Sequence, residues 1–239
     1  MIVLPAMDRA QEAAWHALLD LYDKHPDDWT LIGGQLVHLH CAERGYSPQR
    51  PTNDADAVVN ARIPSALGAV TAALKELKFE PDPSADDVQH RWINGDAVID
   101  VLIPEGTGER TSRRKSASGF PTVAAPGGSQ ALKRTEIVEV QIGSRTGRVP
   151  RPTLLSAMIL KAAAYSETTG SGRKRHCHDF AALAAILAAS DTGTVLLDSK
   201  DRKRLRKMIT ATLALPAAIA ENPTAERRLA RLSEAIDAK

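Results

Sequence analysis

The stretch Arg50-Pro51-Thr52-Asn53-Asp54-Ala55-Asp56-Ala57-Val58-Val59 contains the pattern on which the fold of this chain depends. Its second half alternates and ends in valines, which predicts a strand over residues 54–59. Alternate residues of a strand point to one face, so Asp54 and Asp56 lie side by side on it. Such a pair is a candidate Mg²⁺ site, because this ion prefers oxygen ligands. The plainer interpretation is a solvated strand edge.

A glycine pair precedes this strand. The β-prone run Trp29-Thr30-Leu31-Ile32 is interrupted by Gly33-Gly34, and a helix is expected over residues 35–43. Glycine lets the backbone approach a phosphate closely, and the first N–H groups of a helix attract anions. Gly33 and Gly34 are therefore candidate phosphate contacts, although a tight turn needs glycine as well.

A third carboxylate lies inside an apolar strand, Val98-Ile99-Asp100-Val101-Leu102. This strand belongs to a predicted hairpin of residues 89–93 and 97–103, turned at Asn94-Gly95. A buried charge is costly unless it is paired or bound to metal. Two divalent ions held by Asp54, Asp56 and Asp100 would stabilise the attacking and leaving oxygens of a phosphate. The glycine pair, the two neighbouring aspartates and the buried aspartate together indicate a phosphate-handling site more specifically than any one of them does alone.

The remaining chain divides into a mixed part and a helical part. Further helices are expected over 8–24 and 64–77, a long exposed loop over 104–130, and strands over 136–142 and 148–149. From Pro152 onwards the pattern is helical, over 152–166, 178–189, 199–214 and 224–237. This order predicts an α+β domain of residues 1–150 and a helical domain of residues 151–239.

Composition describes an ordinary globular protein of 239 residues, 43% hydrophobic and 25% charged. The longest apolar run, Phe180 to Ala189, is too short to cross a membrane. The segment Met1 to Met7 lacks the basic start of a signal peptide. Two cysteines, Cys41 and Cys177, are too few for a disulfide framework, so we expect a cytoplasmic protein.

Charge is divided unevenly along the chain. Residues 1–100 carry 8 Lys and Arg against 16 Asp and Glu, whereas residues 101–239 carry 23 against 13. An acidic half that holds metal and a basic half that receives a polyanion would explain the division. Two halves that neutralise each other across an internal interface would explain it equally well.

These motifs resemble a known superfamily. Leu31-Ile32-Gly33-Gly34, then Arg50 to Asp56, then Val98 to Leu102 are similar to the polymerase-β-like nucleotidyltransferase fold. More narrowly, they resemble the AbiEii toxin group, whose signature is a Gly-Gly helix followed by Arg-x-Thr-x-Asp-x-Asp. The resemblance covers about residues 29–190.

The helical part carries the rest of the resemblance. Lys161, in Leu160-Lys161-Ala162-Ala163-Ala164, matches the lysine of the family's first C-terminal helix. The family then has a basic stretch followed by Lys-Asp-x-x-Asp-Leu, where this chain has Arg175-His176-Cys177-His178-Asp179-Phe180. The final aspartate matches, arginine replaces lysine, and His176 replaces the first aspartate.

The resemblance implies a nucleotidyltransferase domain over residues 1–150, followed by a helical domain, and it implies a role for each matched residue. Gly33, Gly34 and Lys161 would bind the nucleotide, with Lys161 contacting its phosphates as a point charge. Asp54, Asp56 and Asp100 would bind Mg²⁺, and Asp100 would also help to deprotonate the acceptor hydroxyl. Asp179 would face the same cleft, and Arg50 and Thr52 would brace the loop before the strand.

The resemblance also implies partners. A nucleoside triphosphate would donate a nucleotide to an RNA acceptor, such as the 3′ end of tRNA, and a cognate antitoxin would pair with the chain as a toxin. The basic runs Arg113-Arg114-Lys115 and Arg202 to Lys207 are candidate RNA contacts or solvated surfaces. Two alternatives stay open: a nucleotidyltransferase acting on a small molecule such as an aminoglycoside, and a catalytically silent binding protein.

Overall fold

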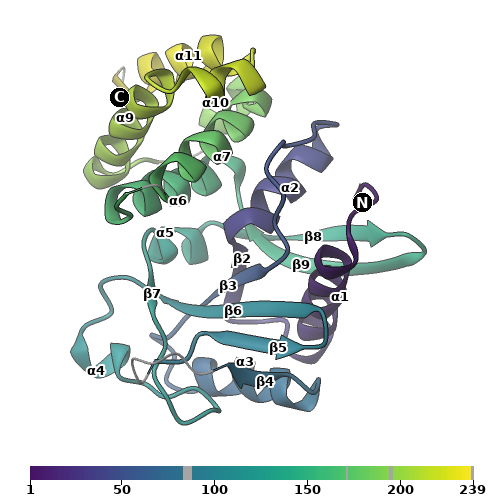
Figure 1. The fold of residues 1–239 in the computed structure, drawn as a ribbon. Coiled ribbons are helices and arrows are strands. Elements are labelled where there is room, and N and C mark those ends of the chain that lie inside the picture. The colour runs from purple at the N-terminus through teal and green to yellow at the C-terminus, as the bar shows by residue number, and fades with distance from the viewer. Residues whose placement is uncertain (83–87, 171, 194–195, 238–239) are drawn as a thin grey trace.

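The computed structural model describes residues 1–82, 88–170, 172–193 and 196–237. The chain forms two parts in succession. The first contains two β-sheets, and in the second the described residues form helices only (Figure 1). The sheets lie in the lower half of Figure 1, and the later helices lie above them.

The main sheet positions the residues of interest. Its strands are β2 (Trp29–Ile32), β3 (Ala55–Val59), β4 (Glu80–Asp82), β5 (Arg91–Asn94) and β6 (Ala97–Pro104), in the spatial order β2-β3-β6-β5-β4, with β7 (Ala124–Ala125) beside β6. Strands β3 and β6 are parallel, and the hairpin β5–β6 is antiparallel. The turn of this hairpin contains Gly95 at φ 57°, the left-handed conformation that the Asn94-Gly95 pair predicts.

A second sheet consists of β1 (Ile2–Val3), β8 (Thr135–Ile142) and β9 (Arg145–Pro152), with β8 in the middle. The β8–β9 hairpin extends beyond the body of the molecule (Figure 1). The longer helices that accompany the sheets are α1 (Arg9–Lys24), α2 (Gly33–Glu43), α3 (Ala66–Glu76) and α5 (Gly128–Lys133). Helix α1 begins where Asp8 accepts a hydrogen bond from the Gln11 amide at 2.8 Å, an N-cap of the usual kind.

The helical part begins directly after β9. Its members are α6 (Leu154–Glu167), α7 (Gly172–Ile186), α8 (Ala189–Gly193), α9 (Ser199–Leu213), α10 (Pro216–Glu221) and α11 (Ala225–Asp237). The core runs through both parts, because Trp15, Trp92 and Phe180 are all fully buried within one cluster. Helix α7 is buried along most of its length, which explains its nearly uniform apolar sequence from Phe180 to Ile186.

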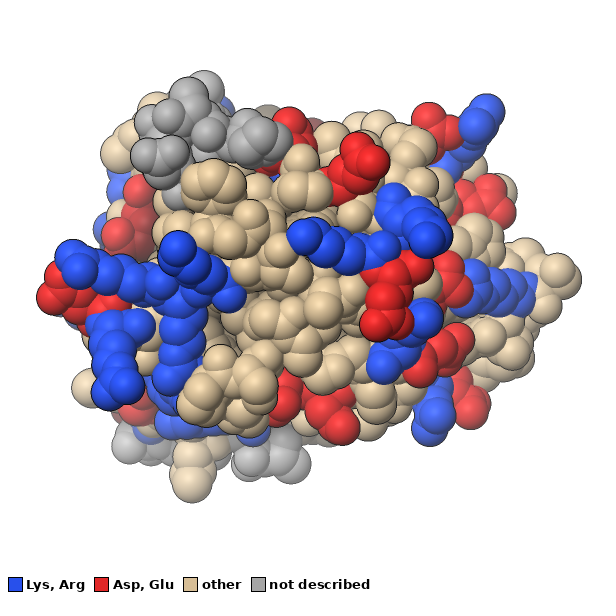
Figure 2. All heavy atoms as spheres, turned by 90° about the horizontal axis from the view of Figure 1, so that it is seen from below, with Lys and Arg blue, Asp and Glu red and all other residues tan. Residues whose placement is uncertain are grey.

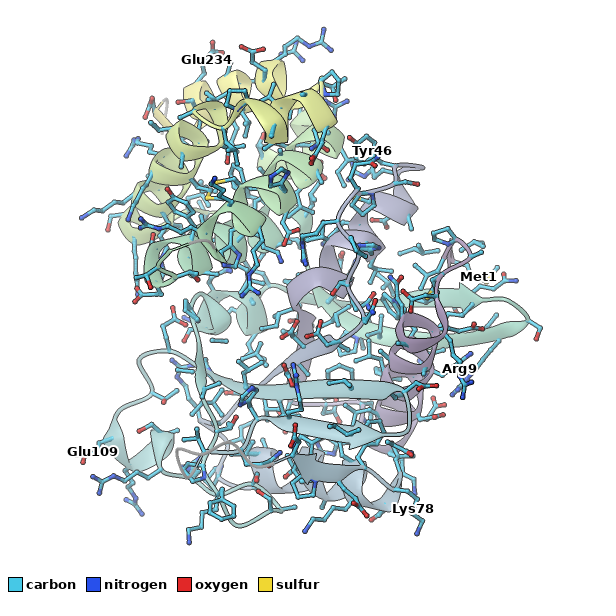
Figure 3. The ribbon with its side chains drawn as sticks, in the orientation of Figure 1. Met1, Arg9, Tyr46, Lys78, Glu109 and Glu234 are labelled. Atoms are coloured by element: carbon cyan, nitrogen blue, oxygen red, sulfur yellow. The ribbon has the colours of Figure 1, made fainter. Side chains whose placement is uncertain are left out.

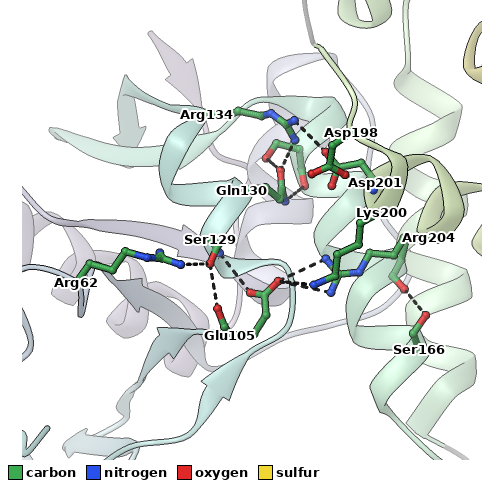
Figure 4. Close-up of polar contacts among 12 residues, drawn as sticks. Arg62, Glu105, Ser129, Gln130, Arg134, Ser166, Asp198, Lys200, Asp201 and Arg204 are labelled. Atoms are coloured by element: carbon green, nitrogen blue, oxygen red, sulfur yellow. Dashed lines mark hydrogen bonds and ion pairs between the residues drawn. The ribbon is translucent and has the colours of Figure 1, made fainter. Parts of the chain in front are cut away.

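Polar contacts connect the helical part to the sheets. Glu105, which follows β6, faces the Lys200 ammonium at 3.8 Å and the Arg204 guanidinium at 3.4 Å, both on α9 (Figure 4). Tyr46, just after α2, lies beside the helical part (Figure 3) and donates to the Asn222 side chain at 2.7 Å.

Most predicted elements are present, and the differences are local. Residues 104–130, expected to be one loop, contain β7, α5 and the short helix α4 (Glu109–Ser112). Helix α7 begins at Gly172 rather than at His178, and β9 is longer than the predicted 148–149. Short elements lack a full period of hydrophobic residues, so pattern alone does not reveal them. No helix among the described residues is long and apolar enough to cross a membrane.

Candidate active site

Three charged residues form one row across the main sheet. The register pairs Asp56 of β3 with Asp100 of β6, and pairs Asp100 with Arg91 of β5. Paired residues of neighbouring strands share a face, so these side chains lie together. Arg91 donates through Nε to Asp100 Oδ1 and through Nη2 to Asp100 Oδ2, each at 2.9 Å. The same Nη2 lies 3.4 Å from Asp54 Oδ2, so Asp54, the neighbour of Asp56 in the sequence motif, also belongs to this group.

The glycine pair at the start of α2 fits directly against this group. Gly33 has φ +75°, and a β-carbon added there would lie 1.8 Å from Asp56 Oδ2. A β-carbon on Gly34 would lie 2.3 Å from the Thr52 hydroxyl. Both positions therefore require glycine, because the loop and strand that carry Asp54 and Asp56 pack directly against the start of α2. The first turn of α2 has no side-chain cap, so its N–H groups are available where Gly33 and Gly34 line the cavity.

The loop before β3 is held by side chains of α2. Gln35 donates to the Thr52 carbonyl at 3.0 Å, and the His38 ring lies 2.9 Å from the Arg50 carbonyl. Because that carbonyl only accepts, His38 Nε2 carries the proton. The Thr52 hydroxyl in turn lies 3.3 Å from Asp54 Oδ1. Thr52 thus braces Asp54, as predicted, whereas the Arg50 side chain makes a longer-range contact.

A second group of charges comes from the helical part. Asp179 of α7 accepts from Lys161 of α6 at 2.7 Å and from Arg50 at 2.8 and 3.2 Å. Lys161 and Asp179 are both buried, at 5% and 4% exposed. Burial alone would raise the pKa of Asp179, but the Lys161 and Arg50 cations outweigh it and lower that pKa to about 2.

Both groups line one cavity of about 420 Å³ between the sheet and the helices. Its lining includes all the residues predicted for the site: Gly33, Gly34, Asp54, Asp56, Asp100, Lys161 and Asp179. Four cations face the same space, namely Arg50, Arg91, Lys161 and Arg175. The cavity therefore offers carboxylates on the sheet, cations around them, and a helix N-terminus, which together suit a phosphorylated ligand and its metal ion.

The carboxylates affect one another strongly. Burial, and then the charges of Asp54 and Asp100, raise the pKa of Asp56 to about 7, although Lys161 and Arg175 act in the opposite direction. A metal ion among these carboxylates would relieve the same repulsion. Raised pKa values of this origin are typical of functional sites.

His176 of α7 also lies at the cavity. It lines the cavity, its Nε2 lies 3.1 Å from the Thr168 hydroxyl, and its Nδ1 has no hydrogen-bond partner among the described residues. Burial, and then Lys161 and Arg175, lower its pKa to about 4. The ring is neutral at pH 7, so it contributes no charge to the cavity.

The donor set fits a hard divalent cation. Asp54, Asp56 and Asp100 provide carboxylate oxygens only, and the space that a Gly33 side chain would fill lies against Asp56. Nevertheless, the described residues contain no group of three or more His, Cys, Asp or Glu side chains already arranged as a metal site. Arg91, which contacts both Asp54 and Asp100, stands among the carboxylates instead.

Sequence reasoning missed Arg91, Arg175 and the partner of Arg50. Arg91 lies on β5, the first strand of the hairpin, and only the strand register shows that it faces Asp100 on β6. The resemblance explains Arg175 only as a replacement for a lysine and does not indicate that it lines the cavity. Asp179 is 129 positions from Arg50, and no local pattern connects them.

Comparisons with known proteins were informative for the fold. No protein-family model matches the chain, and no curated protein matches it. Among solved structures, it is similar to an antigenic nucleotidyltransferase-like protein from Paracoccidioides brasiliensis, with a TM-score of 0.52 and 13% identity over 90% of this chain and 95% of that one. The antibiotic-resistance factor ANT(2'')-Ia has a TM-score of 0.47 and 13% identity over 88% of this chain and 97% of that one.

The fold is therefore α+β of the nucleotidyltransferase kind, followed by a helical part, which confirms the predicted fold class. The likeness supports the superfamily resemblance at the level of fold.

Proposed function

We propose that this protein is a metal-dependent nucleotidyltransferase, which transfers a nucleotide from a nucleoside triphosphate to an acceptor hydroxyl. One observation carries the proposal: Asp56 of β3, Asp100 of the parallel strand β6 and Asp54, just before β3, line one cavity with an uncapped helix N-terminus and a buried lysine. Binding without catalysis would not require carboxylates that repel one another and phosphate.

In the proposed reaction, the acceptor oxygen forms a bond to the α-phosphorus, and the bond from that phosphorus to pyrophosphate breaks. Asp54 and Asp56 would hold Mg²⁺, which supplies Lewis-acid stabilisation of the phosphate charge when bound. The first N–H groups of α2 and the Lys161 ammonium would orient the triphosphate. Asp179 positions Lys161 and Arg50 through the contacts described above.

Asp100 has a more complicated place in this scheme. We expected it to complete the metal site and to take the acceptor proton, but both of its oxygens accept hydrogen bonds from Arg91. Neither oxygen is therefore free for a metal ion or for the acceptor proton while Arg91 holds both. Asp100 can take up either role only after the Arg91 contact changes.

For the acceptor we propose RNA, such as the 3′ end of tRNA, and for the biological role a cytoplasmic toxin with a cognate antitoxin, as the AbiEii resemblance suggests. The excess of basic residues after residue 100 supports a polyanionic acceptor. Seen from below, basic side chains gather at the end of the sheet part where α4 lies (Figure 2). There, Arg110, Arg113 and Lys115 are exposed.

The second basic run supports RNA binding less than its sequence indicates. On α9, Lys200 and Arg204 face Glu105, Arg206 pairs with Asp237, and Arg202 donates to the Ile236 carbonyl. These side chains therefore brace the fold. Arg114 of the first run likewise donates to the Ala61 carbonyl, so the exposed Arg110, Arg113 and Lys115 are the better candidates for RNA contact.

The test incubates the protein with each labelled nucleoside triphosphate, Mg²⁺ and either total RNA or an aminoglycoside. We expect label in RNA, and a loss of at least about a hundredfold in Asp56→Ala, because metal positioning and charge stabilisation disappear together. Asp96→Ala is the matched control, since Asp96 lies on the β5–β6 turn and pairs only with exposed Arg9 among the described residues. Label in the aminoglycoside would favour the small-molecule alternative, and no transfer to either would favour a silent binding protein.

The biological role has its own test. Growth arrest on expression of the wild type, and normal growth with Asp56→Ala, would support a toxin. Protection of cells from an aminoglycoside by a harmless wild type would instead support antibiotic modification.

A further inference from the structure

Arg91 stands where the carboxylates of the cavity converge. Its Nη2 lies 2.9 Å from Asp100 Oδ2 and 3.4 Å from Asp54 Oδ2, so one nitrogen contacts one oxygen of each carboxylate. Any ion held by Asp54 and Asp100 would therefore compete with this nitrogen for the same oxygens. The hydrogen bond to Asp100 also raises the pKa of Arg91, so the guanidinium is always charged there.

The position of Arg91 is built into the sheet. The register of the hairpin places it opposite Asp100, and its neighbour Trp92 is fully buried on the other face of β5. Asp100 is nearly inaccessible, with 9% of its side chain exposed, whereas 38% of the Arg91 side chain is exposed. The arginine can move its terminal nitrogens into the cavity, but Asp100 cannot reach a cation in bulk solvent.

We infer that Arg91 is an internal counter-cation that competes with the divalent ion for Asp54 and Asp100, and that its Nη2 leaves these oxygens when the ion binds. The inference deepens the proposed function and rests on it for the identity of the site. The physical reason is Coulomb repulsion, because a divalent ion held by these oxygens would lie within a few ångströms of a full positive charge. Arg91 Nε holds the other oxygen of Asp100, so the arginine stays on the cavity wall.

This arrangement gives Arg91 two tasks as a positioning residue. Without metal, it keeps a buried carboxylate paired and holds Asp54 nearby, which limits the cost of the uncompensated charge. With metal, its free nitrogens face the cavity, where a planar guanidinium suits phosphate oxygens. A residue that merely supported a metal ligand by hydrogen bonding would instead strengthen metal binding.

Binding of Mn²⁺ to the full-length protein, freed of metal and without nucleotide, separates the two roles. The concentration of free Mn²⁺ is followed by electron paramagnetic resonance for the wild type, Arg91→Gln and Arg91→Lys. We expect Arg91→Gln to bind Mn²⁺ at least about tenfold more tightly, since the competing charge is gone. Arg91→Lys keeps the positive charge but lacks the planar guanidinium, so we expect its Mn²⁺ affinity to lie between those of the wild type and Arg91→Gln. Arg145→Gln, which removes an arginine paired with Asp20 outside the cavity, is the matched control and leaves the affinity unchanged.

The opposite results overturn the inference. A supporting role predicts that Arg91→Gln weakens Mn²⁺ binding by about 10–100-fold. The same Mn²⁺ affinity in Arg91→Gln as in the wild type also contradicts competition between Arg91 and the ion. So does the absence of Mn²⁺ binding in both proteins. A protein that binds Mn²⁺ as expected but transfers no nucleotide would remove the proposed function and leave this inference in place.

A second measurement follows Arg91 in the wild-type protein itself. The Nε–H resonance of Arg91, assigned by its absence from the spectrum of Arg91→Lys, is followed in the wild type during titration with Mg²⁺. We expect it to shift in a saturable way as Nη2 leaves the carboxylates. A resonance that stays unchanged at saturating Mg²⁺ would refute the displacement.

Discussion

Asp56 is the carboxylate whose protonation depends most on its neighbours. Its ordinary pKa of 3.8 rises to about 7, first through burial and then through the charges of Asp54 and Asp100. Between these two pH values the folded protein binds a proton that the unfolded chain does not. Asp56 therefore contributes stability below about pH 4, and this contribution is lost as the pH rises through 7.

We expect Asp56→Asn to be more stable than the wild type at pH 8 by on the order of 2 kcal/mol, because an amide does not ionise. The difference should shrink towards pH 5, where the wild-type carboxyl is protonated. Urea unfolding of metal-free protein from pH 5 to 8 measures it, with exposed Asp96→Asn as the control. Parallel stability curves for the wild type and Asp56→Asn would contradict the raised pKa. His176, whose lowered pKa acts in the opposite direction, is present in both proteins and cancels in the comparison.

Glycine at position 33 shows how much of a motif can be understood at the scale of one residue. The sequence indicates only that the backbone turns or approaches something there. The structure adds both a φ of +75° and the carboxylate of Asp56 where a side chain would lie. Glycine is therefore needed at position 33 because the Asp56 side chain packs against the start of α2. This requirement does not depend on which ligand binds in the cavity.

At the scale of elements, Asp179 joins three segments. It connects α7 to Lys161 on α6 and to Arg50 in the loop before β3. Removal of its charge leaves two cations without their acceptor, and breaking a buried pair in this way costs more than the pair itself contributes.

We expect Asp179→Asn to lower the free energy of unfolding by about 3 kcal/mol or more. Glu76→Gln, which removes the partner of Lys24 from an exposed pair, should change it by less than about 0.5 kcal/mol. Urea denaturation at pH 7 compares the two. Equal losses for both variants would show that the buried ion group does not hold these elements together.

Helix boundaries also show what sequence patterns miss at this scale. The polar run from Arg173 to Arg175 lacks an apolar period, yet it forms the first turns of α7 and places Arg175 at the cavity. Tertiary contacts decide the start of this helix. Arg173, for example, lies over the Tyr165 ring at 4.6 Å and donates to its carbonyl at 3.0 Å.

At the scale of the whole molecule, the uneven charge of the chain is not a simple neutralisation of one half by the other. Glu43 pairs with Arg151, as an acidic first half would predict, but Arg44 and Arg50 pair with Asp191 and Asp179 in the opposite sense. Contacts of both kinds join the segments before and after residue 150. We therefore propose that the domains 1–150 and 151–239 are distinct in sequence pattern but coupled by ion pairs, one of which, Arg50–Asp179, lies at the cavity.

Glu105 offers a test of this coupling. We expect Glu105→Gln to speed amide hydrogen exchange in the first turns of α9, because Lys200 and Arg204 lose their carboxylate partner there. Exchange in β3 and β6 should stay slow. The control is Glu109→Gln, which removes an exposed partner of Arg113 on α4. Unchanged exchange in α9 would show that packing alone connects the helical part to the sheets.

The sequence by itself determined most of the longer strands and helices, the closeness of Asp54 to Asp56, and the need for glycine where α2 begins. These features depend on local periods and backbone sterics, which neighbouring residues specify. Only the tertiary structure decided that Arg91 faces Asp100, that Asp179 holds Lys161 and Arg50, and that all of them line one cavity. Such contacts depend on strand register and on helix packing between distant segments, and their energies come from burial and charge rather than from any local pattern.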